Sequence, residues 1–248
     1  MLTVTVLGCG SSLGVPVIGC DCKVCTSPSP YNKRTRSAIF IEQDDTKILV
    51  DFGFEIREQL VKARVKNLDA AILTHDHADH VSGIDNLRAF PFLQNQPLDI
   101  YIESASKEIV ENKYKYLFRG SLLRAVPIDF YAKVQIKNVE VQFFRQTHAE
   151  IDSLGIRISD FVYSSDVVDF PPKSQEYLDN IDTWIVDCVA YKTMSAHAGL
   201  DRILLWNEKY KPRQILLTNM RHDIDYEEII KILPKNIAPL YDGYQFKI

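Results

Sequence analysis

The chain has 248 residues, of which 46% are hydrophobic and 25% charged, and its net charge is −4. This is the composition of an ordinary globular protein, long enough to bury a core without disulfides. The acidic balance and the lack of a dense Lys/Arg run argue against strong nucleic-acid binding.

The first residues, MLTVTVLGCG, lack the features of a signal peptide. No stretch approaches the roughly 20 apolar residues that span a bilayer. We therefore expect a cytoplasmic protein with no membrane contact, whose five cysteines are reduced. In a reducing compartment the cluster Cys20, Cys22 and Cys25 indicates a metal site more than a disulfide knot. The sequence leaves open whether the chain forms a homodimer.

Short apolar runs alternate with helical patterns along the chain. Runs rich in Val, Ile, Leu and Tyr that end at Gly, Asp, Asn or Ser predict strands at Thr3–Leu7, Ala38–Ile41, Lys47–Asp51, Ala70–Leu73, Asp99–Ile102, Val134–Phe144, Gly155–Ile158, Phe161–Ser164, Thr183–Asp187 and Gln214–Leu217. Apolar residues spaced by three and four predict helices at Phe54–Val65, Ile84–Phe90, Ser106–Phe118, Gly199–Tyr210 and Tyr226–Ile232. Asp225 is a natural N-cap for the last helix.

The order of these elements predicts an α/β fold. Paired strand runs over residues 38–51 and 134–164 indicate antiparallel meanders, and strands alternate with helices elsewhere. Two sheets between helical layers fit this order, and so does a doubly wound sheet. Because no linker or repeat divides the sequence, we expect one domain over residues 1–248.

The strongest local signal follows the strand run Ala70–Leu73. It reads Thr-His-Asp-His-Ala-Asp-His and places His75, His77, Asp79 and His80 within six residues. Imidazoles and carboxylates together suit divalent cations such as Zn²⁺ or Mn²⁺. His75 and His77 could hold one ion, while Asp79 and His80 hold a neighbouring one.

This HxHxDH motif resembles the signature of the metallo-β-lactamase superfamily, whose members share an αββα sandwich with two mixed sheets and a one- or two-metal site. Residues 7–25, with LGCGSSLGVP and GCDCKVC, are similar to the opening of the phosphoribosyl cyclic-phosphate phosphodiesterases. Val50-Asp51-Phe52-Gly53 resembles the superfamily's Asp-x-Gly strand end. The resemblance extends over residues 4–243.

By position, the resemblance makes His148 the third histidine ligand and Asp166 the carboxylate that bridges two cations. His148 also follows a long predicted strand, where a ligand could project toward the motif, and a Gly-containing loop is expected after it. A bridging carboxylate relieves the repulsion between two close cations.

Asn219 departs from the family pattern, which has a histidine ligand there in a Thr-His-x-x-His segment. The chain reads Thr218-Asn219-Met220-Arg221-His222. An amide oxygen donates more weakly than imidazole. We therefore expect the second ion to be held by Asp79, His80 and Asp166, with Asn219 or water, and to be lost easily.

The resemblance gives His222 a role with the cysteines. Together with Cys20, Cys22 and Cys25 it would complete a closed Cys₃His site for one structural zinc. The alternatives are unliganded thiols, or a His222 that turns into the active site to replace the missing ligand.

His197 and Asp79 are the candidate catalytic residues. His197 precedes a predicted helix and resembles a family position from which an imidazole could protonate the leaving oxygen. The resemblance implies a phosphodiesterase in which two cations activate water against a small cyclic phosphate or nucleotide-like diester, with a nucleoside monophosphate as a product mimic. Alternatives are a nuclease, a thioester or lactone hydrolase, and a ligand-binding accessory protein.

Overall fold

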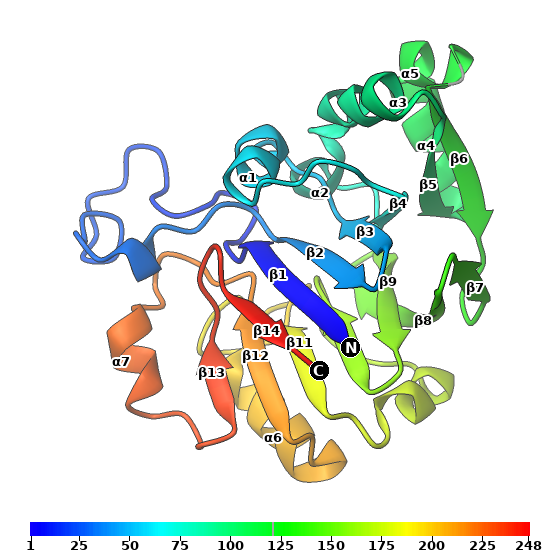
Figure 1. Ribbon diagram of the computed structural model, residues 1–248. Helices are drawn as coiled ribbons and strands as arrows, with labels where there is room; N and C mark the ends of the chain where they lie inside the picture. The colour runs from blue at the N-terminus through cyan, green and yellow to red at the C-terminus, as the bar shows by residue number, and fades with distance from the viewer. Residues whose placement is uncertain (121) are drawn as a thin grey trace.

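Two seven-stranded sheets lie face to face, with helices on their outer sides, in the computed structural model of the chain (Figure 1). The structure describes residues 1–120 and 122–248. This arrangement is the αββα sandwich that the sequence predicts, and it excludes the doubly wound sheet.

The first sheet is built from the N-terminal half of the chain and the last strand. Its strands are, in spatial order, β14 (Gln245–Lys247), β1 (Leu2–Gly8), β2 (Ala38–Gln43), β3 (Thr46–Val50), β4 (Ala70–Leu73), β5 (Leu98–Glu103) and β6 (Leu123–Ile128). The pairs from β14 to β3 are antiparallel, and those from β3 to β6 are parallel. The two chain ends therefore pair at one edge.

The second sheet mirrors this organisation. Its strands are, in spatial order, β13 (Ile237–Pro239), β12 (Gln214–Thr218), β11 (Thr183–Asp187), β10 (Phe161–Ser164), β9 (Ile151–Ile158), β8 (Val139–His148) and β7 (Lys133–Ile136). Pairs from β13 to β10 are parallel, and those from β10 to β7 are antiparallel. Each sheet thus contains a parallel block whose strand ends can carry a site.

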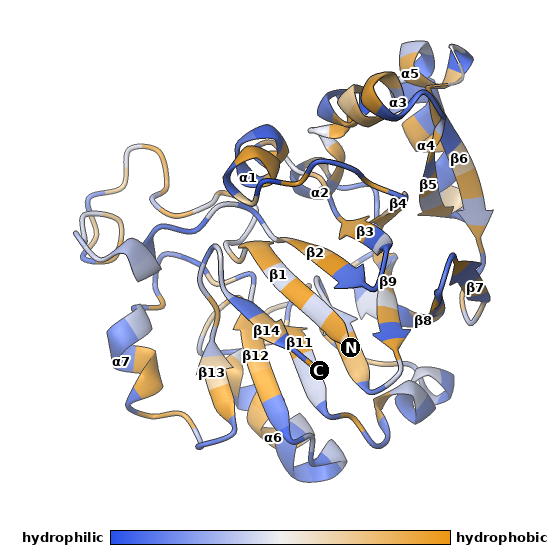
Figure 2. Ribbon diagram, in the orientation of Figure 1, coloured by the Kyte–Doolittle hydropathy of each residue, from blue (hydrophilic) through white to orange (hydrophobic). Residues whose placement is uncertain are grey.

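Alternating side chains divide the core. In β2, Ile39 and Ile41 face the core shared with the second sheet, whereas Ala38 and Phe40 face the core under the helices. Strands β1, β2 and β12 are accordingly largely in the colour of hydrophobic residues in Figure 2. The helices are α1 (Ile56–Lys62), α2 (Ala78–Val81), η2 (Ile84–Arg88), α3 (Ala89–Gln94), α4 (Ser104–Lys113), α5 (Lys115–Arg119), α6 (Leu200–Tyr210) and α7 (Tyr226–Ile230), with η1 (Pro30–Asn32) and η3 (Pro172–Leu178). None of the helices described is long and apolar enough to cross a membrane.

Several predicted elements need correction. The single strand predicted over residues 134–144 is the hairpin β7–β8, which turns at Lys137 with a positive φ of 47°. The Gly-containing loop expected after His148 is part of β9, since that strand begins at Ile151. The helix predicted over residues 106–118 breaks at Tyr114, whose φ and ψ are −119° and 37°.

The other differences concern element ends and short strands. The helix predicted from residue 84 is η2 followed by α3, and the one predicted from residue 54 begins only at Ile56. The sequence analysis does not predict strands β6, β13 and β14. The last two are only three residues long, too short to show an apolar pattern. Asp225 does cap α7, because its carboxylate accepts hydrogen bonds from the backbone of Glu227 and Glu228.

A buried arginine connects the N-terminal loop to the segment after β12. The Arg34 side chain, 1% exposed, donates to the carbonyl oxygens of Arg221 at 3.0 Å and Ile224 at 2.7 Å. It also donates to the Tyr31 carbonyl and the Asn32 side chain. These bonds hold the loop over the strand ends where the site lies.

We expect Arg34→Met to lower the free energy of unfolding by about 3 kcal/mol, because several buried acceptors lose their donor. Urea denaturation measures this change. Arg213→Met, at an exposed ion pair with Asp182, is the control and should change stability by less than about 1 kcal/mol. Equal effects of the two substitutions would show that Arg34 does not lock the loop.

Candidate active site

The site is assembled where strands of both sheets end. Asp51 follows β3, and the HxHxDH segment follows β4. From the second sheet, His148 ends β8, Asp166 follows β10 and Asn219 follows β12. The structure therefore brings the predicted active-site residues together from five strand ends.

The first group of donor atoms comes from three histidines and one carboxylate. His75 Nε2 lies 3.0 Å from His77 Nδ1, and His148 Nε2 lies 3.2 Å from the same atom. Asp166 Oδ2 is 3.6 Å from His75 Nε2 and 3.4 Å from His148 Nε2. Ligands at about 2.0–2.2 Å from a tetrahedral zinc are separated by roughly 3–3.5 Å, so these residues fit one divalent ion.

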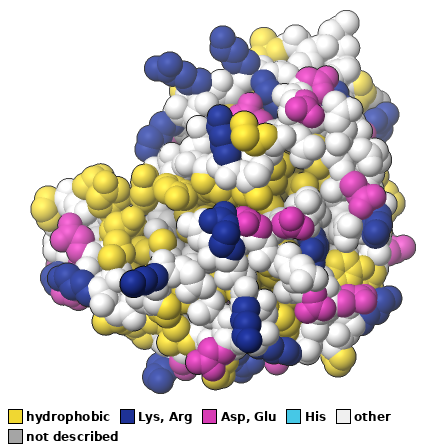
Figure 3. All heavy atoms as spheres, turned by 60° about the horizontal axis from the view of Figure 1, so that its bottom comes forward, with side chains coloured by type: hydrophobic (Ala, Val, Ile, Leu, Met, Phe, Trp, Pro, Cys, Tyr) yellow, Lys and Arg dark blue, Asp and Glu magenta, His cyan; other side chains and the backbone are white. Residues whose placement is uncertain are grey.

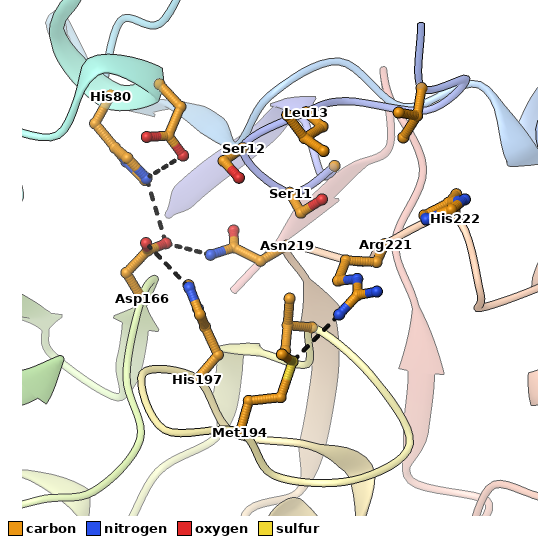
Figure 4. A pocket seen from close by; sticks show the side chains of 14 residues that line it. Ser11, Ser12, Leu13, His80, Asp166, Met194, His197, Asn219, Arg221 and His222 are labelled. Atoms are coloured by element: carbon orange, nitrogen blue, oxygen red, sulfur yellow. Dashed lines mark hydrogen bonds and ion pairs between the residues drawn. The ribbon is translucent and has the colours of Figure 1, made fainter. Parts of the chain in front are cut away.

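The second group shares Asp166 with the first. Its other oxygen, Oδ1, lies 3.3 Å from His80 Nε2, and Asp79 Oδ2 lies 3.4 Å from the same nitrogen. Figure 4 shows His80, Asn219 and His197 converging on Asp166. Because the two Asp166 oxygens face different groups, this carboxylate is placed to bridge two ions, as the resemblance implied.

The far ring nitrogens are held by the protein. His75 Nδ1 contacts the Thr74 hydroxyl at 3.0 Å. His80 Nδ1 contacts the Asp51 carboxylate at 2.8 Å. His148 Nδ1 donates to the Ala196 carbonyl at 2.9 Å. Such contacts fix the ring orientation and leave the other nitrogen for a metal.

The electrostatics also fit a cation. Burial lowers the pKa of His75 and His148, which keeps both imidazoles neutral as metal ligands must be. Burial would lower the pKa of His80 as well, but Asp166 and Asp51 raise it well above its usual value. The carboxylates thus favour positive charge where the second group of donors converges.

Gly53 explains the Asp-x-Gly motif. A Cβ on Gly53 would lie 2.0 Å from the backbone oxygen of Asp79, so a side chain there would displace the loop that carries the ligands. The amide of Phe52 also donates to the His80 carbonyl at 2.7 Å. The turn at Phe52 and Gly53, after β3, therefore holds the segment with Asp79 and His80, after β4, in position.

Asn219 lies where a second-ion ligand was predicted, but its amide NH₂ faces Asp166 and donates to Oδ1 of that carboxylate. Its oxygen accepts from the Ser37 hydroxyl. Coordination by this oxygen would require the amide to turn over. The role of Asn219 as a ligand stays a prediction.

His197 forms a pair with a buried carboxylate that the sequence analysis missed. His197 Nδ1 lies 2.7 Å from Asp187 Oδ2, and His197 Nε2 lies 4.0 Å from Asp166. Burial opposes the imidazolium charge, but Asp187 raises the pKa of His197 to about 9. Burial raises the pKa of Asp187 to about 6. The sequence does contain a feature that could have identified Asp187, because this carboxylate stands at the end of an apolar strand run, as Asp51 does.

The three clustered cysteines meet His222, away from the Asp166 group. Cys20 Sγ and Cys22 Sγ lie 3.2 and 3.4 Å from His222 Nδ1, and the donor atoms of all four residues lie within 4.8 Å of one another. A hydrogen bond from the Cys25 amide and the contact with His222 lower the pKa of Cys22 to about 6, which favours the thiolate that binds metal. The alternative in which His222 turns into the active site is not the arrangement observed.

The pocket beside these groups has a volume of about 280 Å³. Its lining includes Asp79, His80, Asp166 and His197, and Figure 4 shows Arg221 and His222 on the side away from Asp166. Pockets for small ligands start at about 300 Å³, so this one suits a small substrate.

Comparison with known proteins defines the class. A family model described as "Beta-lactamase superfamily domain" matches residues 46–220. The chain belongs to this superfamily, and its sandwich is the metallo-β-lactamase fold. The resemblance predicted from the sequence is thereby confirmed.

Individual relatives and solved structures show which members of the superfamily the chain resembles. The crystal structure of a new diphosphatase from the PhnP family is similar, with a TM-score of 0.95 and 29% identity over 100% of this chain and 98% of that one. An octanoyltransferase of Porphyromonas gingivalis is 29% identical over 96% of this chain and 50% of its own length. A ribonuclease Z of Methanosarcina mazei is 29% identical over 62% of this chain and 47% of its own length. The chain thus spans about half of these curated relatives.

We expect one zinc to survive mild chelation, because a closed Cys₃His site releases its ion slowly, and elemental analysis measures it. Cys25→Ser should remove that zinc and lower the melting temperature by roughly 5 °C or more, the effect of about 2 kcal/mol. Cys188→Ser, at a buried cysteine outside the cluster, should retain the zinc. Zinc retention in Cys25→Ser would rule out the structural site.

We expect Asn219→His to tighten the second ion about tenfold, because imidazole is a better donor than an amide. Isothermal titration of metal-stripped protein with Mn²⁺ measures the affinity. Asn112→His, on the exposed face of α4, is the control and should leave it unchanged. Unchanged or weaker binding in Asn219→His would mean that this position does not serve the second ion.

Proposed function

We propose that this chain is a metal-dependent hydrolase of a small phosphodiester, such as a cyclic phosphate or a nucleotide-like diester. The observation that carries the proposal is the pair of donor groups sharing Asp166, which opens into a pocket beside His197. The similar structure described as a PhnP-family diphosphatase and the ribonuclease Z relatives support phosphorus–oxygen bond hydrolysis.

The ligands we propose are His75, His77, His148 and Asp166 for one Zn²⁺ or Mn²⁺, and Asp79, His80 and Asp166 for a second, weaker one. When bound, these cations supply Lewis acidity and lower the pKa of water, so that hydrolysis can proceed near neutral pH. Asp166 fixes the position of the two donor groups relative to each other, because it is buried and contacts a histidine of each group.

His197 is the general acid in this proposal. Its Nδ1 is occupied by Asp187, so Nε2 is the nitrogen that can carry a proton into the pocket. A raised pKa keeps this imidazole protonated at neutral pH, ready to donate to the departing oxygen. Asp187 orients the ring and stabilises its charged form.

A nuclease is the second candidate, because of the ribonuclease Z relatives. The small volume of the pocket favours the small substrate instead. On the one face shown in Figure 3 the lysines and arginines are scattered among acidic and hydrophobic side chains. The net charge of −4 also argues against a nuclease that binds long nucleic acids, because such binding depends on basic side chains that neutralise phosphates.

The test is hydrolysis by metal-stripped protein to which Mn²⁺ or Zn²⁺ is restored. We expect cyclic and linear small diesters to be cleaved only with the ion, and His77→Ala to lower kcat/KM by at least about a hundredfold, in keeping with the loss of a metal ligand. Circular dichroism should show an intact fold. Cleavage of structured RNA but not of small diesters would favour the nuclease, and cleavage of thioesters alone would exclude a phosphodiesterase.

We expect His197→Gln to slow diesters with poor alkoxide leaving groups at least about tenfold more than activated aryl diesters, because an aryloxide needs little protonation to depart. Steady-state kcat values on a matched alkyl and aryl pair measure this difference. An equal loss on both substrates would make His197 a binding residue.

A further inference from the structure

Three polar side chains around Asp166 have no role in the proposed reaction. Ser37 stands just before β2, Ser165 just after β10 and Asn219 just after β12. All three are buried. A buried polar side chain is stable only when its hydrogen bonds are made, so the partners of these residues indicate what the residues do.

Two of these side chains donate to the same oxygen of Asp166. The Asn219 NH₂ donates to Oδ1, and the Ser165 hydroxyl donates to Oδ1 at 3.0 Å. The Asn219 NH₂ also lies 3.3 Å from the Ser165 oxygen, so the two donors are held next to each other. The other oxygen, Oδ2, faces His75 and His148. The hydrogen bonds on Oδ1 therefore fix the plane of the carboxylate and keep Oδ2 directed at the first group of donors.

The Asn219 amide is itself held in one orientation. Its oxygen accepts a hydrogen bond from the Ser37 hydroxyl, whose oxygen lies 3.2 Å from the Thr218 hydroxyl. Figure 4 shows the amide nitrogen, not the amide oxygen, directed at Asp166. Turning the amide over would bring its oxygen against Oδ1 of Asp166, and two acceptors repel each other. Ser37 and Asp166 thus favour the same orientation.

The backbone around Asn219 is fixed as well. Its φ of 58° lies in the left-handed region, which asparagine adopts more readily than most residues. The Thr218 carbonyl accepts from the Cys188 amide at 2.9 Å, and the Met220 amide donates to the Cys9 carbonyl at 3.0 Å. The amide side chain is therefore presented from a rigid segment.

We propose that Asn219, held by Ser37, is a positioning residue that sets the orientation of Asp166 and is not itself a ligand of the second ion. The inference rests on the proposed function, because it takes Asp166 to bridge two ions. The second site then has three protein donors, from Asp79, His80 and Asp166. Zinc takes four ligands and manganese about six, so the remaining positions belong to water and substrate.

A ligand role for Asn219 would make the opposite demand on Ser37. The amide oxygen would have to leave the Ser37 hydroxyl to reach an ion, so the hydroxyl would compete with that ion. In the positioning role, the same hydroxyl supports the site. The direction in which removal of the Ser37 hydroxyl changes metal affinity therefore separates the two roles.

The experiment is a calorimetric titration of metal-stripped protein with Mn²⁺. We expect Ser37→Ala to weaken binding of the second ion about tenfold, the lower end of the loss typical of a residue that orients a metal ligand. The first ion should be affected less, because three histidines also hold it. Ser37→Thr keeps the hydroxyl and should retain most of the wild-type affinity.

A double-mutant cycle tests whether Ser37 acts through Asn219. Asn219→Ala should weaken the second ion to the same extent as Ser37→Ala, and the two substitutions together should have no larger effect than either alone. Thr218→Val, which removes the hydroxyl beside Ser37, is a further variant with a smaller loss in the same direction, and it keeps the test open if Ser37→Ala does not fold.

Ser174→Ala is the matched control. Ser174 is also buried, lies 3.2 Å from the Tyr131 hydroxyl on η3 and does not line the pocket. Its substitution should leave both Mn²⁺ affinities unchanged. Circular dichroism and zinc content show whether each variant is folded.

Tighter or unchanged binding of the second ion in Ser37→Ala would overturn the inference, and so would a further loss when this substitution is added to Asn219→Ala. With either result, hydrolysis of small diesters by the wild type would leave the proposed function standing. If the wild type neither takes up a second Mn²⁺ nor hydrolyses any diester, the proposed function fails and this inference fails with it.

Discussion

The burial of one carboxylate, Asp166, governs the arrangement of the site. A charge that is 3% exposed is strongly destabilising unless it is compensated. Here compensation comes from His80 and His197, whose pKa values are raised and which lie 3.3 and 4.0 Å from it, and from the Asn219 amide, which donates to it. His80 comes from a segment of the first sheet and the other two from segments of the second, so the carboxylate links the two halves of the sandwich. The same carboxylate contributes negative charge to both groups of metal donors, and stability and chemistry therefore depend on one side chain.

Much of the fold could be predicted because apolar periodicity is a local property. The strand Ala70–Leu73 and the N-cap at Asp225 were predicted as observed, since each depends on adjacent residues. What failed depends on distant partners. Strand β14 is three residues of mixed polarity that become a strand only because β1 offers hydrogen bonds across a separation of more than 200 residues. The break at Tyr114 leaves an apolar helical pattern uninterrupted in the sequence, so periodicity alone cannot reveal it.

The site residues divide in the same way, into those that neighbouring residues reveal and those that depend on distant contacts. The HxHxDH segment is readable because its ligands are close in the sequence, and the cysteine cluster is readable for the same reason. Asp187 and Ser37 were missed because their importance comes from a single contact each, with His197 and Asn219, that only the folded chain creates. The orientation of the Asn219 amide is likewise beyond the sequence. Residue type at that position predicts a weak ligand, whereas the hydrogen bonds turn its NH₂ toward Asp166.

The three-residue separation between Asn219 and His222 joins the two candidate metal sites through one short stretch of backbone. Arg34 clamps that stretch by its Arg221 carbonyl. Occupancy of either site therefore restricts the conformations open to the other, which is thermodynamic linkage, and linkage is reciprocal. An ion bound at the cysteines would order the backbone that also carries Asn219, and by the same linkage a ligand in the pocket would slow release of that ion.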